Sequence, residues 1–191
     1  MMAAVAERVS ERELDDLTLA RARRGEREAQ RALVLRYQRP VWALLRRHLG
    51  TEEDIEDLAQ ETFLRVFRAL PSFRSSPTAR LSTWILTIAI RLAVDRHRRT
   101  RRSPFVDREV MVESPAPGPD CAFEQRATGE AIARAVEALP PEYRAAFILR
   151  AYHDFDYREI GEALGCDVGT VKSRISRARA RLRQELQKVD V

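Results

Sequence analysis

The chain has 191 residues, 45% hydrophobic and 33% charged, a balance typical of folded proteins that excludes global disorder. No stretch approaches the ~20 apolar residues of a membrane span, and residues 1–16 are too charged for a secretory signal, so we expect a cytoplasmic protein without membrane insertion. Cys121 and Cys166 lie in unrelated contexts and the three histidines are scattered, so we expect neither a disulfide nor a metal site.

The formal net charge is only +5, but the charges are segregated along the chain. Residues 51–61 contain six acids and no Lys or Arg, whereas residues 91–102 contain six arginines and one acid. Residues 103–124 are acidic again, with five acids and one arginine. This segregation indicates several partners of different charge rather than one uniformly basic surface.

Almost every segment of the first half has helical periodicity, without strand alternation or internal repeats, so we expect an all-α fold. A polar tail and a short helix occupy residues 1–25. The helix predicted over residues 26–49 contains Pro40, which would kink that helix or divide it in two. An acidic helix over residues 51–70 and a strongly apolar helix over residues 82–99 follow, with a loop between them.

A composition break separates the two halves of the chain. Residues 103–124 hold four prolines and little periodic apolar content, which is typical of an extended linker. A second helical unit follows over residues 125–188, and Pro140–Pro141 marks the start of its second helix. We therefore predict two small helical domains, 26–102 and 125–188, joined by a Pro-rich acidic linker.

Residues 157–186 predict a helix-turn-helix. Asp156 and Glu159 have the spacing of a capping box, which starts the first helix at Tyr157. Gly165 is placed to end that helix, because glycine adopts the left-handed conformation at little cost. Asp167 can then cap the second helix.

The second helix of this motif is cationic around a single apolar stripe. The stripe consists of Val171, Ile175, Ala178, Leu182 and Leu186. The remaining surface carries Lys172, Arg174, Arg177, Arg179, Arg181 and Arg183 against one acid, Glu185. Such a helix suits the phosphate-lined major groove of duplex DNA, and Gly169 and Thr170 let its N-terminus approach the backbone. The alternative is an exposed, charged C-terminal helix or coiled-coil end.

The acidic helix has two contrasting faces. Its predicted core face consists of Ala59, Phe63, Val66, Phe67 and Leu70. With about 100° of turn per residue, the opposite face carries Asp57, Gln60, Glu61 and Leu64. A leucine among acids and an amide is a candidate protein contact, in which the acids steer a basic partner. A solvated surface is the simpler alternative, and a carboxylate metal site is a third.

The apolar helix is predicted to lie at the centre of the first domain, because its first half is apolar nearly all round. Thr87, Arg91, Arg98 and Arg102 form one stripe that could follow a nucleic-acid backbone. The preceding loop, beside Trp84, could hold an unstacked base. Alternatively, Trp84 packs in the core and the terminal arginines complement the helix dipole in solvent.

Four motifs in a fixed order carry a family resemblance. They are DIEDLAQETFLRVFRAL, FRSSPTARLSTWILTIAIRLAVDRHRR, LPPEYRAAFILRAY and YREIGEALGCDVGTVKSRISRARARL. Over about residues 26–187 the chain resembles a bacterial RNA polymerase sigma factor of the extracytoplasmic-function type. The third sigma region of larger family members is absent, which limits the resemblance to the two-domain class.

The resemblance implies a role for each module. The acidic helix would bind the clamp coiled coil of core RNA polymerase through Asp57, Gln60, Glu61 and Leu64. The domain of residues 26–102 would melt the minus-ten element and capture its strand through Ser75, Ser76, Thr78, Arg80, Trp84, Arg91 and Arg98. The domain of residues 125–188 would read the minus-thirty-five duplex through Thr170, Lys172, Ser173, Arg174, Ser176, Arg177 and Arg181. The polymerase flap tip would dock on the same domain.

The resemblance also implies an anti-sigma regulator, no cofactor and a monomeric free chain. Many family members have asparagine where this chain has Arg91. We expect no enzymatic activity, because the sequence contains no catalytic triad, phosphate loop or metal-ligand spacing. The alternatives are a self-sufficient helix-turn-helix repressor or activator and a nuclease that uses the carboxylates of residues 51–61 with a divalent metal.

Overall fold

The structure is a computed structural model that describes residues 13–49, 52–74, 80–102, 129 and 131–187. Within these ranges every regular element is helical, as the sequence predicts. The elements are α2 (Asp16–Arg23), α3 (Arg27–Leu49), α4 (Glu52–Ala69), the 3₁₀ turn η1 (Leu70–Ser72), α5 (Leu81–Arg102), a helical segment over residues 131–137, α7 (Pro141–Tyr152), α8 (Tyr157–Leu164) and α9 (Val168–Gln187). No helix in the described part of the chain is long and apolar enough to cross a bilayer.

Helix α3 runs without interruption through Pro40, so the alternative of a division at this proline is wrong. A proline inside a helix removes one backbone hydrogen bond and costs about 3 kcal/mol. The residues that follow offset this cost, because Val41, Leu44 and Leu45 are fully buried. Packing against the core therefore decides the local conformation here, rather than helix propensity.

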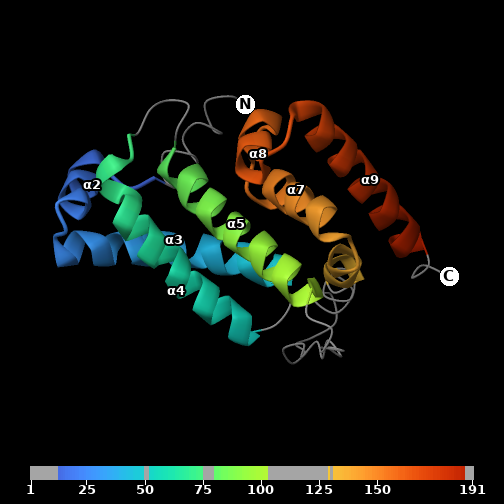
Figure 1. The fold of residues 1–191 in the computed structure, drawn as a ribbon, viewed down its shortest axis with the longest axis horizontal. Helices are drawn as coiled ribbons and strands as arrows, with labels where there is room; N and C mark the ends of the chain where they lie inside the picture. The colour runs from blue at the N-terminus through green and yellow to red at the C-terminus, as the bar shows by residue number, and fades with distance from the viewer. Residues whose placement is uncertain (1–12, 50–51, 75–79, 103–128, 130, 188–191) are drawn as a thin grey trace, which may run out of the picture.

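Helices α3, α4 and α5 pack against one another to form the first unit, with α2 and η1 at one end (Figure 1). Helix α5 lies at its centre, as predicted, and its residues Ile85, Ala89, Ile90 and Ala93 are fully buried. The side chain of Glu13 accepts hydrogen bonds from the backbone N–H and the hydroxyl of Ser82 at the start of α5. This contact satisfies one of the free N–H groups of the first turn.

The second unit contains the predicted helix-turn-helix. Asp156 and Glu159 form the capping box of α8, with hydrogen bonds of 2.7 Å in both directions. Gly165 ends α8 in the left-handed conformation, with φ at 64°. Gly161 is needed for a second reason, because a Cβ at this position would lie 2.7 Å from the carbonyl oxygen of Cys166. The turn therefore brings the backbones of α8 and the connection to α9 into direct contact.

The two units also pack against each other. Helix α5 contacts α7 and α8, and α3 contacts α7, so the buried side chains of both units form one continuous core. Figure 1 shows α5 between the rest of the first unit and the pair α7 and α8. The predicted linker, 103–124, lies outside the described residues. The direct contact between the units is a feature that the sequence did not predict.

Candidate nucleic-acid and protein interfaces

Helix α9 presents the cationic surface that the sequence predicts. Its apolar stripe is buried through Val171, Ile175, Ala178 and Leu182 and partly buried at Leu186. Three of the polar candidates of α9, Lys172, Ser173 and Ser176, are exposed. Arg174 is half-buried, and its Nη1 lies 3.5 Å from the Sγ of Cys166. The stripe thus fixes α9 on its own unit and leaves Lys172, Ser173 and Ser176 at the surface.

The N-terminus of α9 is closed by Asp167, as predicted. Its Oδ1 accepts a 2.8 Å hydrogen bond from the N–H of Thr170, and its Oδ2 accepts a 2.6 Å hydrogen bond from the Thr170 hydroxyl. These bonds hold the pKa of Asp167 below its usual range. The carboxylate and the helix dipole stabilise each other here. Thr170 is consequently engaged by its own cap, a contact that the site prediction did not include.

Tyr143 on α7 holds two of the predicted groove residues. The Nη1 of Arg177 donates to the Tyr143 hydroxyl at 3.2 Å. The Cζ of Arg181, one turn further along α9, lies 5.4 Å from the centroid of the same ring. A guanidinium at this distance from an aromatic face is attracted to it. The sequence analysis missed Tyr143, whose only sequence signal is an aromatic residue in the helix before the motif.

The acidic helix α4 has the two faces that its periodicity predicts. Its core face is buried through Ala59, Phe63 and Val66, with Phe67 partly buried, and the buried Leu70 of η1 continues this face. On the opposite face Asp57 and Gln60 are exposed, and Leu64 is 50% exposed. Glu61 is half-buried and pairs with Arg65 at 2.7 Å. Among the element pairs in substantial contact, α4 packs on α3, α5 and η1 and on none of α7, α8 and α9.

Another acid of the same helix has a structural use. The Asp54 side chain is buried and pairs with Arg96 of α5, with the Nε and Nη2 of the arginine at 3.1 and 2.5 Å from one carboxylate oxygen. This ion pair joins α4 to α5. The cluster of acids in residues 51–61 is therefore divided between a buried structural pair and an exposed face.

The predicted strand-binding residues have different environments. Trp84 is half-buried and stacks on Phe73, with ring centroids 4.6 Å apart, whereas Arg98 is exposed. The predicted loop residues Ser75, Ser76 and Thr78 lie outside the described residues. Two further residues, Arg80 and Arg91, contact the second unit.

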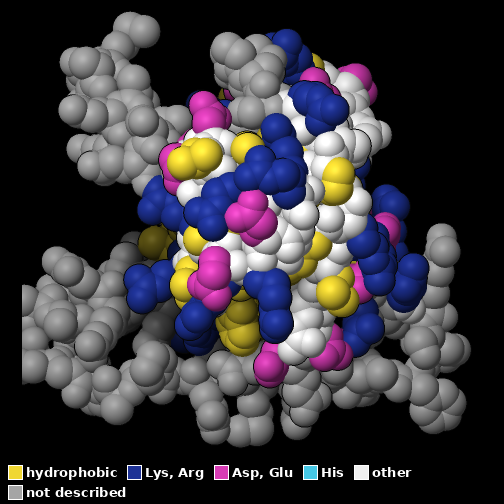
Figure 2. Space-filling model, turned by 90° about the vertical axis from the view of Figure 1, so that its left-hand side faces the viewer, with side chains coloured by type: hydrophobic (Ala, Val, Ile, Leu, Met, Phe, Trp, Pro, Cys, Tyr) yellow, Lys and Arg dark blue, Asp and Glu magenta, His cyan; other side chains and the backbone are white. Residues whose placement is uncertain are grey.

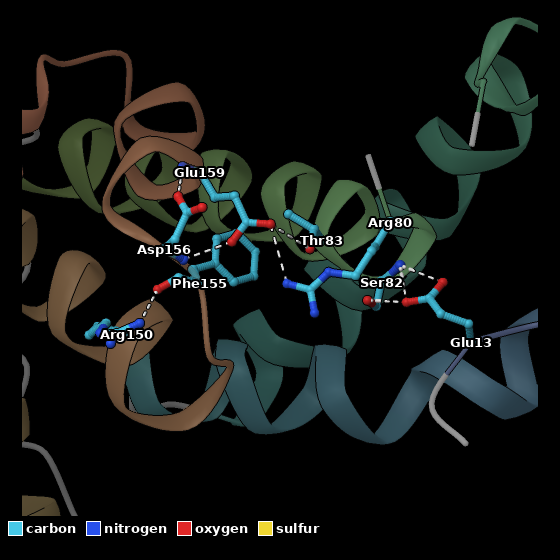
Figure 3. Close-up of polar contacts among 8 residues, drawn as sticks. All are labelled: Glu13, Arg80, Ser82, Thr83, Arg150, Phe155, Asp156 and Glu159. Atoms are coloured by element: carbon cyan, nitrogen blue, oxygen red, sulfur yellow. Dashed lines mark hydrogen bonds and ion pairs between the residues drawn. The ribbon is translucent and has the colours of Figure 1, made fainter. Parts of the chain in front are cut away.

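Arg80 and Arg91 both bind α8. The Nη2 of Arg80 lies 3.2 Å from the Oε1 of Glu159, and the Thr83 hydroxyl lies 3.4 Å from the same oxygen (Figure 3). Further along α5, Arg91 donates to two backbone carbonyls at the end of α8, those of Glu162 at 2.7 Å and Ala163 at 3.0 Å. Cations are favourable at a helix C-terminus because the helix dipole is negative there.

A buried arginine forms a second contact between the units. The Nη1 of Arg144 on α7 donates to the carbonyl of His48, the penultimate residue of α3, at 2.6 Å. The same guanidinium also donates to the carbonyls of Glu137 and Leu139. Burial, with the positive charge of Arg144 beside it, lowers the pKa of His48 to about 3. His48 is therefore neutral at physiological pH.

A cavity of about 470 Å³ lies where the two units meet. It is bordered by α3, the start of α5 and the turn between α7 and α8. The turn itself is held by a 2.9 Å hydrogen bond from Arg150 to the carbonyl of Phe155, whose side chain is 1% exposed (Figure 3). The cavity lies beside Arg80 and Thr83, and so beside the contact with Glu159.

Two family models match this chain, Sigma-70 region 2 over residues 33–103 and Sigma-70 region 4 over residues 129–182. The chain is 35% identical over 159 residues to the ECF RNA polymerase sigma factor SigE of Mycolicibacterium smegmatis, in a match that covers 82% of this chain and 61% of that protein. It is 32% identical over 187 residues to the RNA polymerase sigma-H factor of Pseudomonas aeruginosa, in a match that covers 92% of this chain and 95% of that protein.

Two solved structures have a similar fold and 25% sequence identity. One is the sigma factor RpoE in complex with the anti-sigma factor NepR from Bartonella quintana, with a TM-score of 0.66 over 82% of this chain and 96% of that chain. The other is CnrH in complex with the cytosolic domain of CnrY, with a TM-score of 0.64 over 90% of this chain and 96% of that chain.

Proposed function

Because this chain belongs to the ECF (extracytoplasmic-function) RNA polymerase sigma factors, we propose that three of its surfaces divide the work of promoter-specific transcription initiation. Membership of this family favours transcription initiation over the alternatives of a self-sufficient repressor or a nuclease. Catalysis belongs to the polymerase, and the chain acts in the cytoplasm, where the polymerase works. The domains that carry these surfaces span residues 26–102 and 125–188.

The first surface is the exposed face of α4, which binds the clamp coiled coil of core polymerase. Asp57, Gln60 and Leu64 support this assignment because they are exposed and lie on one face of a helix that is in substantial contact with none of α7, α8 and α9. A half-exposed leucine surrounded by acids combines an apolar contact with electrostatic steering of a basic partner. This exposed acidic face contrasts with the basic surface of α9, and it is the single observation that carries the proposal.

The second surface is α9, which reads the minus-thirty-five duplex. Its N-terminus is capped and its apolar stripe is buried, so the helix is held rigidly while Lys172, Ser173 and Ser176 face solvent. Arg174, Arg177 and Arg181 extend this surface. Lys and Arg contacts to phosphates supply affinity, and side chains that reach base edges supply sequence preference.

The third surface is the start and one stripe of α5, which captures the separated minus-ten strand. Trp84 offers an aromatic face for stacking, while Arg80, Arg91 and Arg98 offer cations for phosphates. The loop residues Ser75, Ser76 and Thr78 complete the set. Together with α9, this surface makes promoter recognition bipartite.

A protein regulator of this chain fits the same comparisons. One similar structure is that of a sigma factor bound to an anti-sigma factor, and the other is that of CnrH bound to the cytosolic domain of CnrY. We propose that a regulator of this class binds the present chain, and that the chain is a monomer when it is free. Such a regulator would cover the polymerase-binding or the DNA-binding surfaces until it is released.

Run-off transcription with core polymerase and a promoter library tests the proposal. Leu64→Arg should abolish transcripts. In the complex the leucine would be buried against a basic partner, and the arginine places a positive charge there that the partner repels. Leu17→Arg is the matched control, since Leu17 is 70% exposed on α2, a helix that packs on α3 and η1. Figure 2 views this end of the first unit, where hydrophobic side chains are scattered among charged ones. Normal transcription from the Leu64→Arg protein would refute the clamp assignment.

A further inference from the structure

The cavity where the two units meet has the size of a small-molecule site. Its volume of about 470 Å³ falls within the range of roughly 300–1,000 Å³ that is usual for such sites. Its walls come from α3, from the start of α5 and from the turn between α7 and α8. Figure 3 shows side chains of two of these walls, Ser82 and Thr83 on one and Phe155 on the other. The described residues that line it include none of those assigned to the α4 face or to α9, so the cavity is separate from these two surfaces.

The charges around the cavity favour an anionic ligand. Its lining contains four arginines and two acids, namely Arg36, Arg39, Arg47, Arg80, Glu13 and Asp154. Of the acids, Glu13 already accepts hydrogen bonds from the hydroxyl groups of Ser82 and Tyr37. Arg36 and Arg39 are exposed and lie three residues apart, and so on neighbouring positions of the α3 surface. Guanidinium groups bind phosphate through paired hydrogen bonds, so these two arginines suit a phosphate group.

A second part of the lining favours a planar ring. The Cζ of Arg47 lies 4.2 Å from the centroid of the Tyr152 ring, so the guanidinium covers the ring. Arg47 also donates to the carbonyl of Ala43 at 3.1 Å, which fixes its position on α3. Pro40 and Leu86 add apolar area to the lining. Aromatic rings and guanidinium groups both stack on planar ligands, so this part suits an aromatic base.

The third part of the lining has an uncommon backbone conformation at Asp154. Its φ is 56°, and among the residues that the structure describes it is the one non-glycine residue with a positive φ. Residues held in this region of φ are concentrated at ligand sites. The turn is fixed by Phe155, which is 1% exposed and whose N–H donates to the carbonyl of Leu149 at 3.2 Å. The Asp154 carboxylate is thereby placed in the lining, where it can accept hydrogen bonds from N–H or O–H groups.

We propose that this cavity binds a nucleoside monophosphate. The phosphate binds Arg36 and Arg39, the base stacks on the pair of Arg47 and Tyr152, and a hydroxyl or N–H group of the ligand donates to Asp154. A nucleoside monophosphate carries all three groups, whereas inorganic phosphate carries only the anion and a nucleoside lacks it. The site adds a small-molecule ligand to the polymerase and promoter of the proposed function, and it rests on neither of them.

Isothermal titration of the free full-length chain with AMP, GMP, CMP and UMP tests the proposal. We expect at least one of the four to bind with a Kd below about 1 mM. The corresponding nucleoside and inorganic phosphate should bind at least about tenfold more weakly, because each lacks a group that one wall recognises. Binding by none of the four nucleotides would overturn the proposal. Binding of inorganic phosphate as tight as that of the nucleotide would do so too, since it would show an unspecific anion contact.

Arg39→Gln locates the bound phosphate. This change removes one exposed cation from the lining, and we expect the nucleotide to bind about tenfold more weakly. Arg31→Gln is the matched control, because Arg31 is an exposed arginine of the same helix that is not among the lining residues. It should change the Kd by less than about twofold. Equal losses in the two variants would show a general effect of charge and would overturn the assignment of the site to this cavity.

Asp154→Asn tests the third wall. Asparagine also tolerates a positive φ, but its side chain keeps only one acceptor oxygen in place of the carboxylate. We expect the nucleotide to bind about three- to tenfold more weakly, with the binding of inorganic phosphate unchanged. Glu162→Gln, at an exposed position of α8 outside the lining, is the control for loss of an acid and should leave both affinities unchanged. A nucleotide affinity that Asp154→Asn does not lower would contradict the proposed arrangement of the ligand.

Discussion

Helices α4 and α5 belong to the same unit, yet their functional faces are in opposite states. The α4 face that we assign to polymerase carries Asp57, Gln60 and the half-exposed Leu64, and α4 is in substantial contact with none of α7, α8 and α9. The α5 face that we assign to DNA has Arg80 and Arg91 bound to α8. The difference lies in the contact with α8, which holds two cations of the α5 face and leaves the α4 face at the surface.

The largest expected effect is at Arg144, the buried residue of α7 that donates a hydrogen bond to the end of α3 and so joins the two units. Replacing it with methionine leaves the carbonyls of His48, Glu137 and Leu139 without this donor. Buried unpaired groups cost about 1–3 kcal/mol each, so we expect a loss of roughly 3 kcal/mol in the free energy of unfolding, measured with urea. Arg158→Met, at an exposed position of α8, is the control and should lose less than half as much.

Acid should weaken the same region through His48. The folded pKa is lowered to about 3 by burial, whereas an unfolded histidine titrates near 6.5. Stability from this group is therefore complete above pH 6.5 and is lost progressively as the pH falls toward 3. Between pH 7.5 and 5.0 we expect a loss of about 2 kcal/mol in the free energy of unfolding, at 1.36 kcal/mol per pH unit below 6.5. A His48→Leu variant should lack this part of the pH dependence; an unchanged dependence would count against the assignment.

On α9, residues that recognise bases can be compared with residues that bind phosphates. Arg174 lies in the N-terminal half of the helix, which we assign to the groove, whereas Arg183 lies near its C-terminal end. We expect Arg174→Ala to cost about 1–3 kcal/mol in minus-thirty-five binding and to relax base preference. Arg183→Ala should weaken binding equally on all sequences. Electrophoretic competition between promoter and random duplexes measures both, and equal relaxation by the two changes would contradict the assignment.

The smallest expected effect is at Tyr143. Its hydroxyl accepts the hydrogen bond from Arg177, and its ring lies beside Arg181. Tyr143→Phe removes only the hydrogen bond, so we expect a loss of about 1 kcal/mol in specific duplex binding. The log–log salt slope should be unchanged, because no phosphate contact is removed. Arg177→Ala combined with Tyr143→Phe should lose no more than Arg177→Ala alone, which a double-mutant cycle would measure.

The features that the sequence predicted correctly depend on neighbours in the chain. The capping box of Asp156 and Glu159 and the left-handed Gly165 follow from spacings of a few residues. The two faces of α4 and the central position of α5 follow from helical periodicity. Each of these patterns involves residues close together in the chain, so each can be predicted without knowing how the two units pack.

The features that were missed depend on residues far apart in the chain. Arg91 contacts carbonyls 71 and 72 residues away, and periodicity shows only that it lies on an exposed stripe of α5. The Glu13 contact with the start of α5 spans 69 residues. The alternative of a break at Pro40 was wrong because the burial of Leu44 and Leu45 outweighs a local penalty. Long-range packing therefore decides what local propensity leaves open.

Gly161 has a consequence for how promoter preference can diverge. Because its missing Cβ lets the Cys166 carbonyl approach, any other residue at this position would push α9 away from α8. The tilt of α9 is therefore set by this main-chain contact together with the buried stripe of Val171, Ile175, Ala178 and Leu182. New specificities in descendants of this protein should arise by exchanging the residues that project from α9, while the angle at which the helix enters the groove is inherited unchanged.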